Sequence, residues 1–104
     1  MSFTLTPDGG ATITFCHKGQ AVPLPAIASI DVPPLCCAVI PHGLLIETDG
    51  PVVKVSEPHI FMERSLLVET CLVRDGEVTT AVFNLSGERR RIRKGDVISR
   101  LVGL

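Results

Sequence analysis

The sequence predicts a single all-β domain over residues 1–104. Glycines and prolines recur roughly every eight to twelve residues, and the runs between them alternate apolar and polar positions, as in a sandwich or barrel. No window combines helix caps with apolar residues three and four apart over ten or more positions. The chain is 45% hydrophobic and 20% charged, which describes a globular protein with one modest core. That core must be aliphatic, because there is no Trp or Tyr and there are only four Phe.

Turn residues and alternation place the elements in order. Residues 21–34 hold four prolines, so we expect an extended, irregular or edge segment there. The segment 65–73 is the most apolar run and is expected to cross the core, while 59–67 is the only place that allows a helical turn. The expected turns are PDGG (7–10), KGQ (18–20), PHG (41–43), DGP (49–51) and RDG (74–76). The expected strands are 11–16, 35–40, 44–48, 52–57, 65–73, 77–85, 88–93 and 97–102.

Charge and hydropathy narrow the class of protein. The net charge of −1 gives no global attraction to nucleic acid or to an anionic membrane, so such binding would need a local patch. No apolar run approaches the roughly 20 residues that span a bilayer. The first ten residues also lack the basic and apolar regions of a signal peptide. We therefore expect a soluble intracellular protein, in the cytoplasm or nucleus, without a membrane partner.

The four cysteines show no C-x-x-C spacing, so a structural zinc site is not expected. Cys16, Cys36, Cys37 and Cys71 are predicted to serve as small apolar core residues. Neighbours in a strand point to opposite faces, so Cys16 and His17 are not expected to act as a nucleophile and base.

A cluster of basic residues follows Glu88, where six of the ten Lys and Arg lie. We expect 81–85, the Ser-Gly turn and 88–93 to form a β-hairpin. Alternation then places Arg89, Arg91 and Arg93 on one face and turns Ile92, with Arg90, to the other. Two interpretations remain open: the charges deter edge-to-edge association, or they bind an anionic partner such as an acidic protein surface, phosphate groups or RNA. The candidate partner-binding residues are Arg89, Arg91, Arg93 and Lys94.

The last strands resemble those of a known family. VFNLSGERRRIRKGDVISRLV (82–102) aligns without a gap to the closing hairpin of trimeric dUTP pyrophosphatases (dUTPases), which carries Phe-Asn, a polar turn, an alternating strand and Lys-Gly-Asp. Residues 32–58 look like the family's proline-started strand, Pro-x-Gly-Leu turn and following strand, and DGEV (75–78) sits where the family has Arg-Gly-Glu-Val. The resemblance implies a compact β jelly roll, a β-sandwich of the dUTPase type, assembled as a homotrimer.

The same resemblance implies where the family's catalytic residues would lie, and this chain departs from them. Cys71 stands at the position of the aspartate that activates water. Val73 and Arg74 stand at those of a second aspartate and a tyrosine. In place of the phosphate-binding Arg-Ser-Gly loop, Arg-Ser is followed by Leu66. The Ala-Gly-Tyr-Asp motif and the glycine-rich C-terminal arm have no counterpart, and the arginine and glutamine of the closing hairpin are replaced by Val97 and Arg100.

We therefore expect no catalytic residue, no cofactor and no metal. The leading interpretation is a non-catalytic dUTPase-like homotrimer that acts in protein interaction or regulation, with a viral origin as an option. A minimal active nucleotide pyrophosphatase is the alternative, and a purely structural trimeric scaffold or virion component is a third. In the active alternative, Arg64 would support the only plausible metal carboxylates, which are Asp75, Glu77 and Asp96.

The C-terminus leaves a further choice open. Val102 and Leu104 either complete the last strand and pack at a trimer axis, or offer an apolar C-terminal motif to a PDZ-type groove.

Overall fold

The computed structural model describes residues 2–16 and 19–104 and is built almost wholly from antiparallel strands. The all-β prediction is confirmed, and the single helix among these residues lies where the sequence allowed a helical turn. Within the described part of the chain, no helix is long and apolar enough to cross a membrane. The elements are β1 (Phe3–Pro7), β2 (Ile13–Phe15), β3 (Ala21–Pro25), β4 (Ile30–Val32), β5 (Cys37–Thr48), β6 (Val52–Ser56), α1 (Pro58–Arg64), β7 (Leu66–Val68), β8 (Cys71–Leu72), β9 (Gly76–Asn84), β10 (Arg90–Ile92) and β11 (Val97–Gly103).

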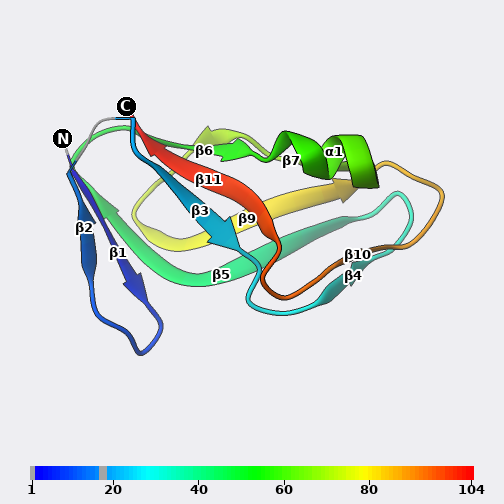
Figure 1. The fold of residues 1–104 in the computed structure, drawn as a ribbon, viewed down its shortest axis with the longest axis horizontal. Helices are drawn as coiled ribbons and strands as arrows, with labels where there is room; N and C mark the ends of the chain where they lie inside the picture. The colour runs from blue at the N-terminus through cyan, green and yellow to red at the C-terminus, as the bar shows by residue number, and fades with distance from the viewer. Residues whose placement is uncertain (1, 17–18) are drawn as a thin grey trace.

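Two sheets form the layers of the molecule (Figure 1). The first has the strand order β2-β1-β5-β9-β7 and the second β3-β11-β6-β8. A short pair, β10 and β4, lies at the end of the molecule away from the two termini (Figure 1). The predicted β-sandwich is therefore present, and β3, the proline-rich segment, is an edge strand as expected.

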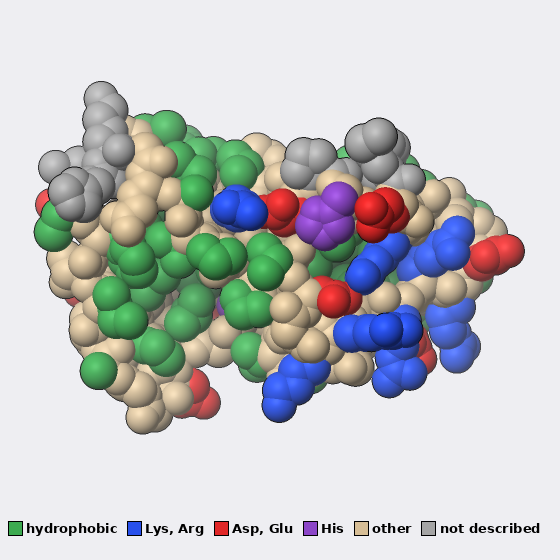
Figure 2. Space-filling model, viewed as in Figure 1, with side chains coloured by type: hydrophobic (Ala, Val, Ile, Leu, Met, Phe, Trp, Pro, Cys, Tyr) green, Lys and Arg blue, Asp and Glu red, His purple; other side chains and the backbone are tan. Residues whose placement is uncertain are grey.

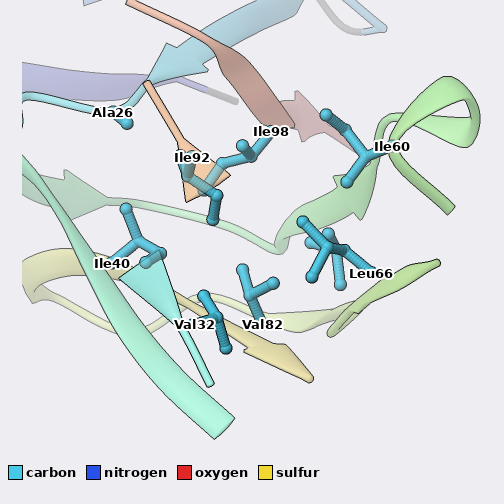
Figure 3. Packing of buried hydrophobic residues seen from close by; sticks show 9 residues of the cluster. Ala26, Val32, Ile40, Ile60, Leu66, Val82, Ile92 and Ile98 are labelled. Atoms are coloured by element: carbon cyan, nitrogen blue, oxygen red, sulfur yellow. The ribbon is translucent and has the colours of Figure 1, made fainter. Parts of the chain in front are cut away.

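The core between the layers divides into two aliphatic clusters. Near the short pair, Ile92 of that pair and Ile98 of the second sheet meet Ile40 and Val82 of the first sheet (Figure 3). The second cluster joins both sheets at the end that carries the termini. It contains Phe3, Leu5, Leu24, Ile46, Val52, Val78 and Leu101. Burial of these side chains supplies most of the stabilisation, at roughly 25 cal/mol per Å² of apolar surface removed from water.

The strands expected at 35–40 and 44–48 are one strand, β5. The turn expected at PHG (41–43) was wrong, because β5 stays hydrogen-bonded to β9 on both sides of it. The register shifts between Pro41 and Leu45, and Gly43 takes a φ of 68° there. The chain absorbs the irregularity as a bulge within the sheet.

The prediction that 65–73 crosses the core as one strand was wrong. The segment forms two short edge strands in different sheets, β7 beside β9 and β8 beside β6. Glu69 lies between them and accepts hydrogen bonds from the Lys54 ammonium at 2.9 Å and the Ala81 amide at 3.1 Å. A carboxylate that binds both layers interrupts the apolar run and lets the chain pass from one sheet to the other.

The cysteines are not core residues, so that prediction was also wrong. Cys16, Cys36, Cys37 and Cys71 are all exposed free thiols. Cys36 lies outside β5, and alternation then turns Cys37 outward together with Val39, while Ile40 faces the core. The expectation about Cys16 and His17 falls partly outside the described residues.

A buried histidine joins four strands by hydrogen bonds. His42 Nδ1 lies 2.8 Å from the Pro25 carbonyl oxygen, and its Nε2 lies 2.7 Å from the Thr80 hydroxyl. A carbonyl only accepts, so Nδ1 carries the proton, and Nε2 of the neutral ring accepts from Thr80. The Thr80 hydroxyl in turn lies 3.0 Å from that of Ser99. Burial holds the pKa of His42 below its ordinary value, and the nearby Lys54 lowers it further against the effect of the Pro25 contact.

A buried lysine ties the two layers together. The side chain of Lys54 is 4% exposed, and its ammonium donates to Glu69 and to the Thr79 carbonyl. Hydrogen bonding to Lys54 holds the pKa of Glu69 below its ordinary range. The contact satisfies a charge that would otherwise be costly to bury.

Candidate anion-binding surface

The four predicted partner-binding residues form a solvent-exposed band, which we call the basic stripe: Arg89, Arg91, Arg93 and Lys94. Ile92 is fully buried in the core, as alternation predicted, while Arg90 is half-buried. Figure 2 shows Lys and Arg side chains gathered at the end of the molecule where β10 lies. The stripe therefore stands on a strand whose only apolar residue anchors it to the core.

The strand that carries the stripe pairs differently from the prediction. β10 is antiparallel to β4, with Arg91 opposite Asp31, and it forms no hairpin with β9. The expected hairpin was wrong because the residues after β9 build a loop that carries the chain away from β9 to pair with β4.

Asn84 organises that loop. Its side chain is buried, and Nδ2 donates to the carbonyls of Val32 at 2.9 Å, Pro33 at 3.1 Å and Glu88 at 2.8 Å. Its Oδ1 accepts from the Ser86 amide at 2.9 Å and from the Ser86 hydroxyl at 2.7 Å. One amide group thus fixes the loop that leads into the stripe against the end of β4.

The Lys-Gly-Asp turn fixes the other end of the stripe. The Asp96 carboxylate accepts from the Arg93 amide at 2.9 Å and from the Arg64 guanidinium at 2.7 Å. Burial by itself would raise the pKa of Asp96, but these two contacts hold it below its ordinary value. Gly95 has a φ of 91°, a left-handed conformation that favours glycine.

Few carboxylates compensate the stripe. Arg91 lies 3.8 Å from Asp31 across the strand pair, and both side chains are largely exposed. Arg89, Arg93 and Lys94 form no ion pair with any other described side chain. Excess positive charge is therefore presented to solvent from a well-anchored backbone.

A separate cleft of about 290 Å³ lies beside β8 and the start of β9. Cys71, the residue at the position of the water-activating aspartate in the resemblance, lines it together with Lys54 and Glu69. Asp75 and Glu77 also line this cleft, and the Asp75 carboxylate accepts from the Thr48 amide at 2.9 Å.

The carboxylates of the active alternative are not assembled into a metal site. Asp75 and Glu77 border the cleft, whereas Asp96 is paired with Arg64 beside the basic stripe. Across residues 2–16 and 19–104, no group of three or more His, Cys, Asp or Glu is placed to hold a metal ion.

The C-terminal residues belong to the sheet. Val102 pairs with Ala21 of β3 and with Val53 of β6, and the Leu104 amide donates to the Pro51 carbonyl at 3.0 Å. The prediction that Val102 completes the last strand is confirmed, while Leu104 remains 50% exposed.

The outward side of the second sheet carries a surface that was not predicted from the sequence. Lys54 points inward, so Val53 and Val55 of β6 face out. Val53 lies opposite the exposed Leu72 of β8, and both valines lie beside residues of β11. Figure 2 shows hydrophobic side chains gathered over β3 and β11 on this side. We call this surface the apolar outer face; it includes Pro23, Val53, Val55, Leu72 and Val102, and Arg100, which is paired with Glu57, lies on it between Pro23 and Val55. The alternation of valines around Lys54 in β6 was the sequence signal for this surface. A lysine in such a pattern is usually expected on the solvent side, which would place Val53 and Val55 in the core.

Comparison with solved structures identifies the architecture. The dUTPase of Streptococcus mutans superimposes with a TM-score of 0.71 over 77% of this chain and 73% of its own, at 10% identity. A variant of Staphylococcus bacteriophage 80alpha dUTPase with dUpNHpp has a TM-score of 0.74 over 96% of this chain and 80% of its own, at 16% identity. The fold is that of the dUTPases. EIAV dUTPase gives a TM-score of 0.65 over 77% and 70% of the two chains, at 15% identity. No family model and no curated protein matches the sequence.

The dUTPase fold agrees with the resemblance found in the closing strands. At this level of identity the similarity concerns the fold, and function must be argued from the residues that this chain carries.

Proposed function

We propose that this chain is a non-catalytic module of the dUTPase fold that assembles as a homotrimer and binds an anionic partner through the basic stripe. The observation that carries the proposal is the arrangement of Arg89, Arg91, Arg93 and Lys94. All four side chains are exposed on a backbone fixed at one end by Asn84 and at the other by the Lys-Gly-Asp turn.

A preformed stripe favours binding. The anchored backbone needs little ordering when a partner arrives, so less free energy is lost on association. Like charges at alternate positions of one strand repel one another, and a partner carboxylate or phosphate relieves this repulsion. Three of the four side chains already lack an ion-pair partner among the described residues, so no internal salt bridge must break.

The apolar outer face supports assembly. A sheet surface with Val53, Val55, Leu72 and Val102 turned outward resembles an interface core more than the surface of a monomer. The resemblance to trimeric dUTPases implies three subunits around an axis. A trimer would present three copies of the basic stripe, so weak single contacts would gain avidity.

A regulatory role has a counterpart among proteins of this fold. Phage dUTPases control the transfer of virulence genes by a proto-oncogenic G protein-like mechanism. For the present chain, the cysteine at the position of the water-activating aspartate argues for interaction without hydrolysis, because a thiol cannot orient water through two carboxylate oxygens.

Assembly is tested by light scattering at micromolar concentration. We expect a mass three times the 11.2 kDa of one chain. Val53→Glu should dissociate the trimer by placing a charge in the apolar outer face, while Ile13→Glu, on an exposed position of β2, should not. A wild-type monomer would refute the trimer.

Partner binding is tested with a fluorescent oligoglutamate and with inorganic polyphosphate. Wild type should bind at least one of these polyanions, and binding should weaken steeply with salt. The triple variant Arg89→Ser, Arg91→Ser, Arg93→Ser should fold and assemble normally but lose binding. Arg74→Ser, an exposed arginine outside the stripe, is the matched control.

Catalysis is tested with dUTP and magnesium. We expect no hydrolysis. Pyrophosphate release that disappears in Asp75→Asn or Asp96→Asn would establish the enzymatic alternative instead. A trimer that binds no polyanion and hydrolyses no nucleotide would favour the structural scaffold.

A further inference from the structure

The strand beneath the basic stripe has one edge without a strand partner. Among the described residues, β10 is hydrogen-bonded to β4 alone, and the short pair contains no third strand. An unpaired edge offers backbone N–H and C=O groups to any extended chain that lies alongside. This opportunity is specific to peptide backbone, since nucleic acid cannot continue a β-ladder.

We propose that an extended acidic peptide segment adds to the open edge of β10 as a β-strand. The inference rests on the proposed function, because it names the partner of the same basic stripe. Backbone hydrogen bonds would provide part of the affinity, and side chains at alternate positions would provide the specificity.

The protein already contains one such contact. On the closed side of β10, Asp31 of β4 stands opposite Arg91, and the two charges approach to 3.8 Å. The residues on either side of Asp31 face the other way: Val32 is fully buried, and Ile30 packs against the core cluster. β4 thus has the pattern apolar-acidic-apolar, with Asp31 on the face of Arg91 and the apolar residues on the face of Ile92.

A strand added to the open edge would face the same alternation of β10 side chains, with Arg91 on one face and Ile92 on the other. An acidic residue opposite Arg91 would lie directly across the pair, where side chains start about 5 Å apart. Arg89 and Arg93 flank β10, two positions from Arg91; continued alternation would place them on the same face, where their long side chains would reach diagonal neighbours. Apolar residues at the intervening positions would lie on the face of Ile92. The expected ligand therefore alternates acidic and aliphatic residues.

This arrangement also unites the two interpretations of the arginines. A second copy of β10 is repelled from the open edge because like charges would stand opposite each other. An acidic strand meets no such barrier. The same side chains that prevent self-association thereby select the partner.

The test uses the chain of 104 residues and three probes: two acetylated heptapeptides and inorganic polyphosphate. One peptide alternates four Glu with three Val, and the other has four Glu followed by three Val. The two peptides have equal charge and composition. We expect the alternating peptide to bind about tenfold or more tightly than the block peptide, since only it can pair backbone and side chains together. Arg91→Ser should weaken this preference, whereas Arg74→Ser should not.

Backbone pairing is tested directly by N-methylation of the alternating peptide. Methylating alternate amides blocks one edge of its strand, and methylating the remaining amides blocks the other. One pattern should abolish binding and the other should preserve it. Hydrogen exchange should show new protection in residues 89–93 when the unmodified peptide binds.

Two results would overturn the inference and differ in their meaning. Equal affinity for both peptides, with no effect of either methylation pattern, would show that the stripe binds anions without strand addition and would leave the proposed function standing. Failure of wild type to bind any of the three probes would remove both the proposed function and this inference.

Discussion

Asn84 is the residue on which the position of the basic stripe most depends. Replacing it by Ala removes an amide whose two N–H groups serve three carbonyls and whose oxygen accepts two hydrogen bonds from Ser86. At about 1 kcal/mol net for each of roughly four bonds that can form at once, Asn84→Ala should lower the free energy of unfolding by ~2–4 kcal/mol. That is a large fraction of the ~5–15 kcal/mol typical of a domain.

Asn84→Asp removes the hydrogen-bond donors of Asn84 while keeping the size of its side chain. A carboxylate has nearly the same shape but cannot donate, so it would face the carbonyl oxygens of Val32 and Glu88 as an uncompensated buried charge. The pKa of the new carboxyl should rise, because its protonated form regains a donor. We therefore expect a loss at pH 7 at least as large as for Asn84→Ala, and partial recovery as the pH falls.

Urea denaturation at one fixed protein concentration measures these changes, since the stability of an oligomer depends on concentration. Ser86→Ala is the control; it removes a half-buried hydroxyl from the same loop and should cost only about 0.5–1 kcal/mol. If Asn84→Ala falls within about 0.5 kcal/mol of wild type, the loop is not organised by this side chain and our account of the stripe fails.

Two further perturbations test the polar groups of the interior. Below pH 6.5, His42 is protonated in the unfolded chain but resists protonation in the folded protein, because its folded pKa is lowered. The free energy of unfolding should therefore decrease by up to about 1.4 kcal/mol per pH unit until the folded pKa is reached. His42→Gln should be less stable at pH 7, but its stability, followed by urea midpoints, should depend less on pH between pH 6.5 and 5. Glu69→Ala should lower the free energy of unfolding by about 3 kcal/mol, because it leaves the buried Lys54 without its carboxylate. Lys54→Met should change it by only about 1 kcal/mol, because the Glu69 side chain is 37% exposed and can be hydrated instead. Equal losses in these two single variants, measured by thermal unfolding, would contradict this asymmetry.

Local features of the sequence predicted the elements that local chemistry determines. The Lys-Gly-Asp turn required a residue able to adopt positive φ, and Gly95 has it. Alternation in 88–93 placed Ile92 inside and the arginines outside, because side-chain direction in a strand follows period two. The basic stripe could therefore be found before any strand pairing was known.

Features set by distant partners could not be predicted in this way. The pairing of β10 with β4 depends on an amide in β9 that binds carbonyls at the end of β4 and in the loop before β10, and nothing in residues 85–89 reveals that contact. The interruption of 65–73 likewise depends on Lys54, which lies more than ten residues earlier. In both cases a buried polar group, and not the apolar pattern, decides the path of the chain.

The inward position of Lys54 has a consequence for how the protein reaches its folded state. A shift of β6 by one residue would turn Val53 and Val55 into the core and move Val52 and Lys54 outward. Two valines would then replace one valine and one lysine in the core, which hydrophobicity alone would favour. The native register is instead selected by the contacts of the Lys54 ammonium group, by burial of Val52 and, in the proposed trimer, by burial of the outward valines. Slipped and native pairings of this strand should therefore compete during folding, and association of subunits would bias that competition. Refolding yield should consequently increase with protein concentration over the range in which subunits begin to associate.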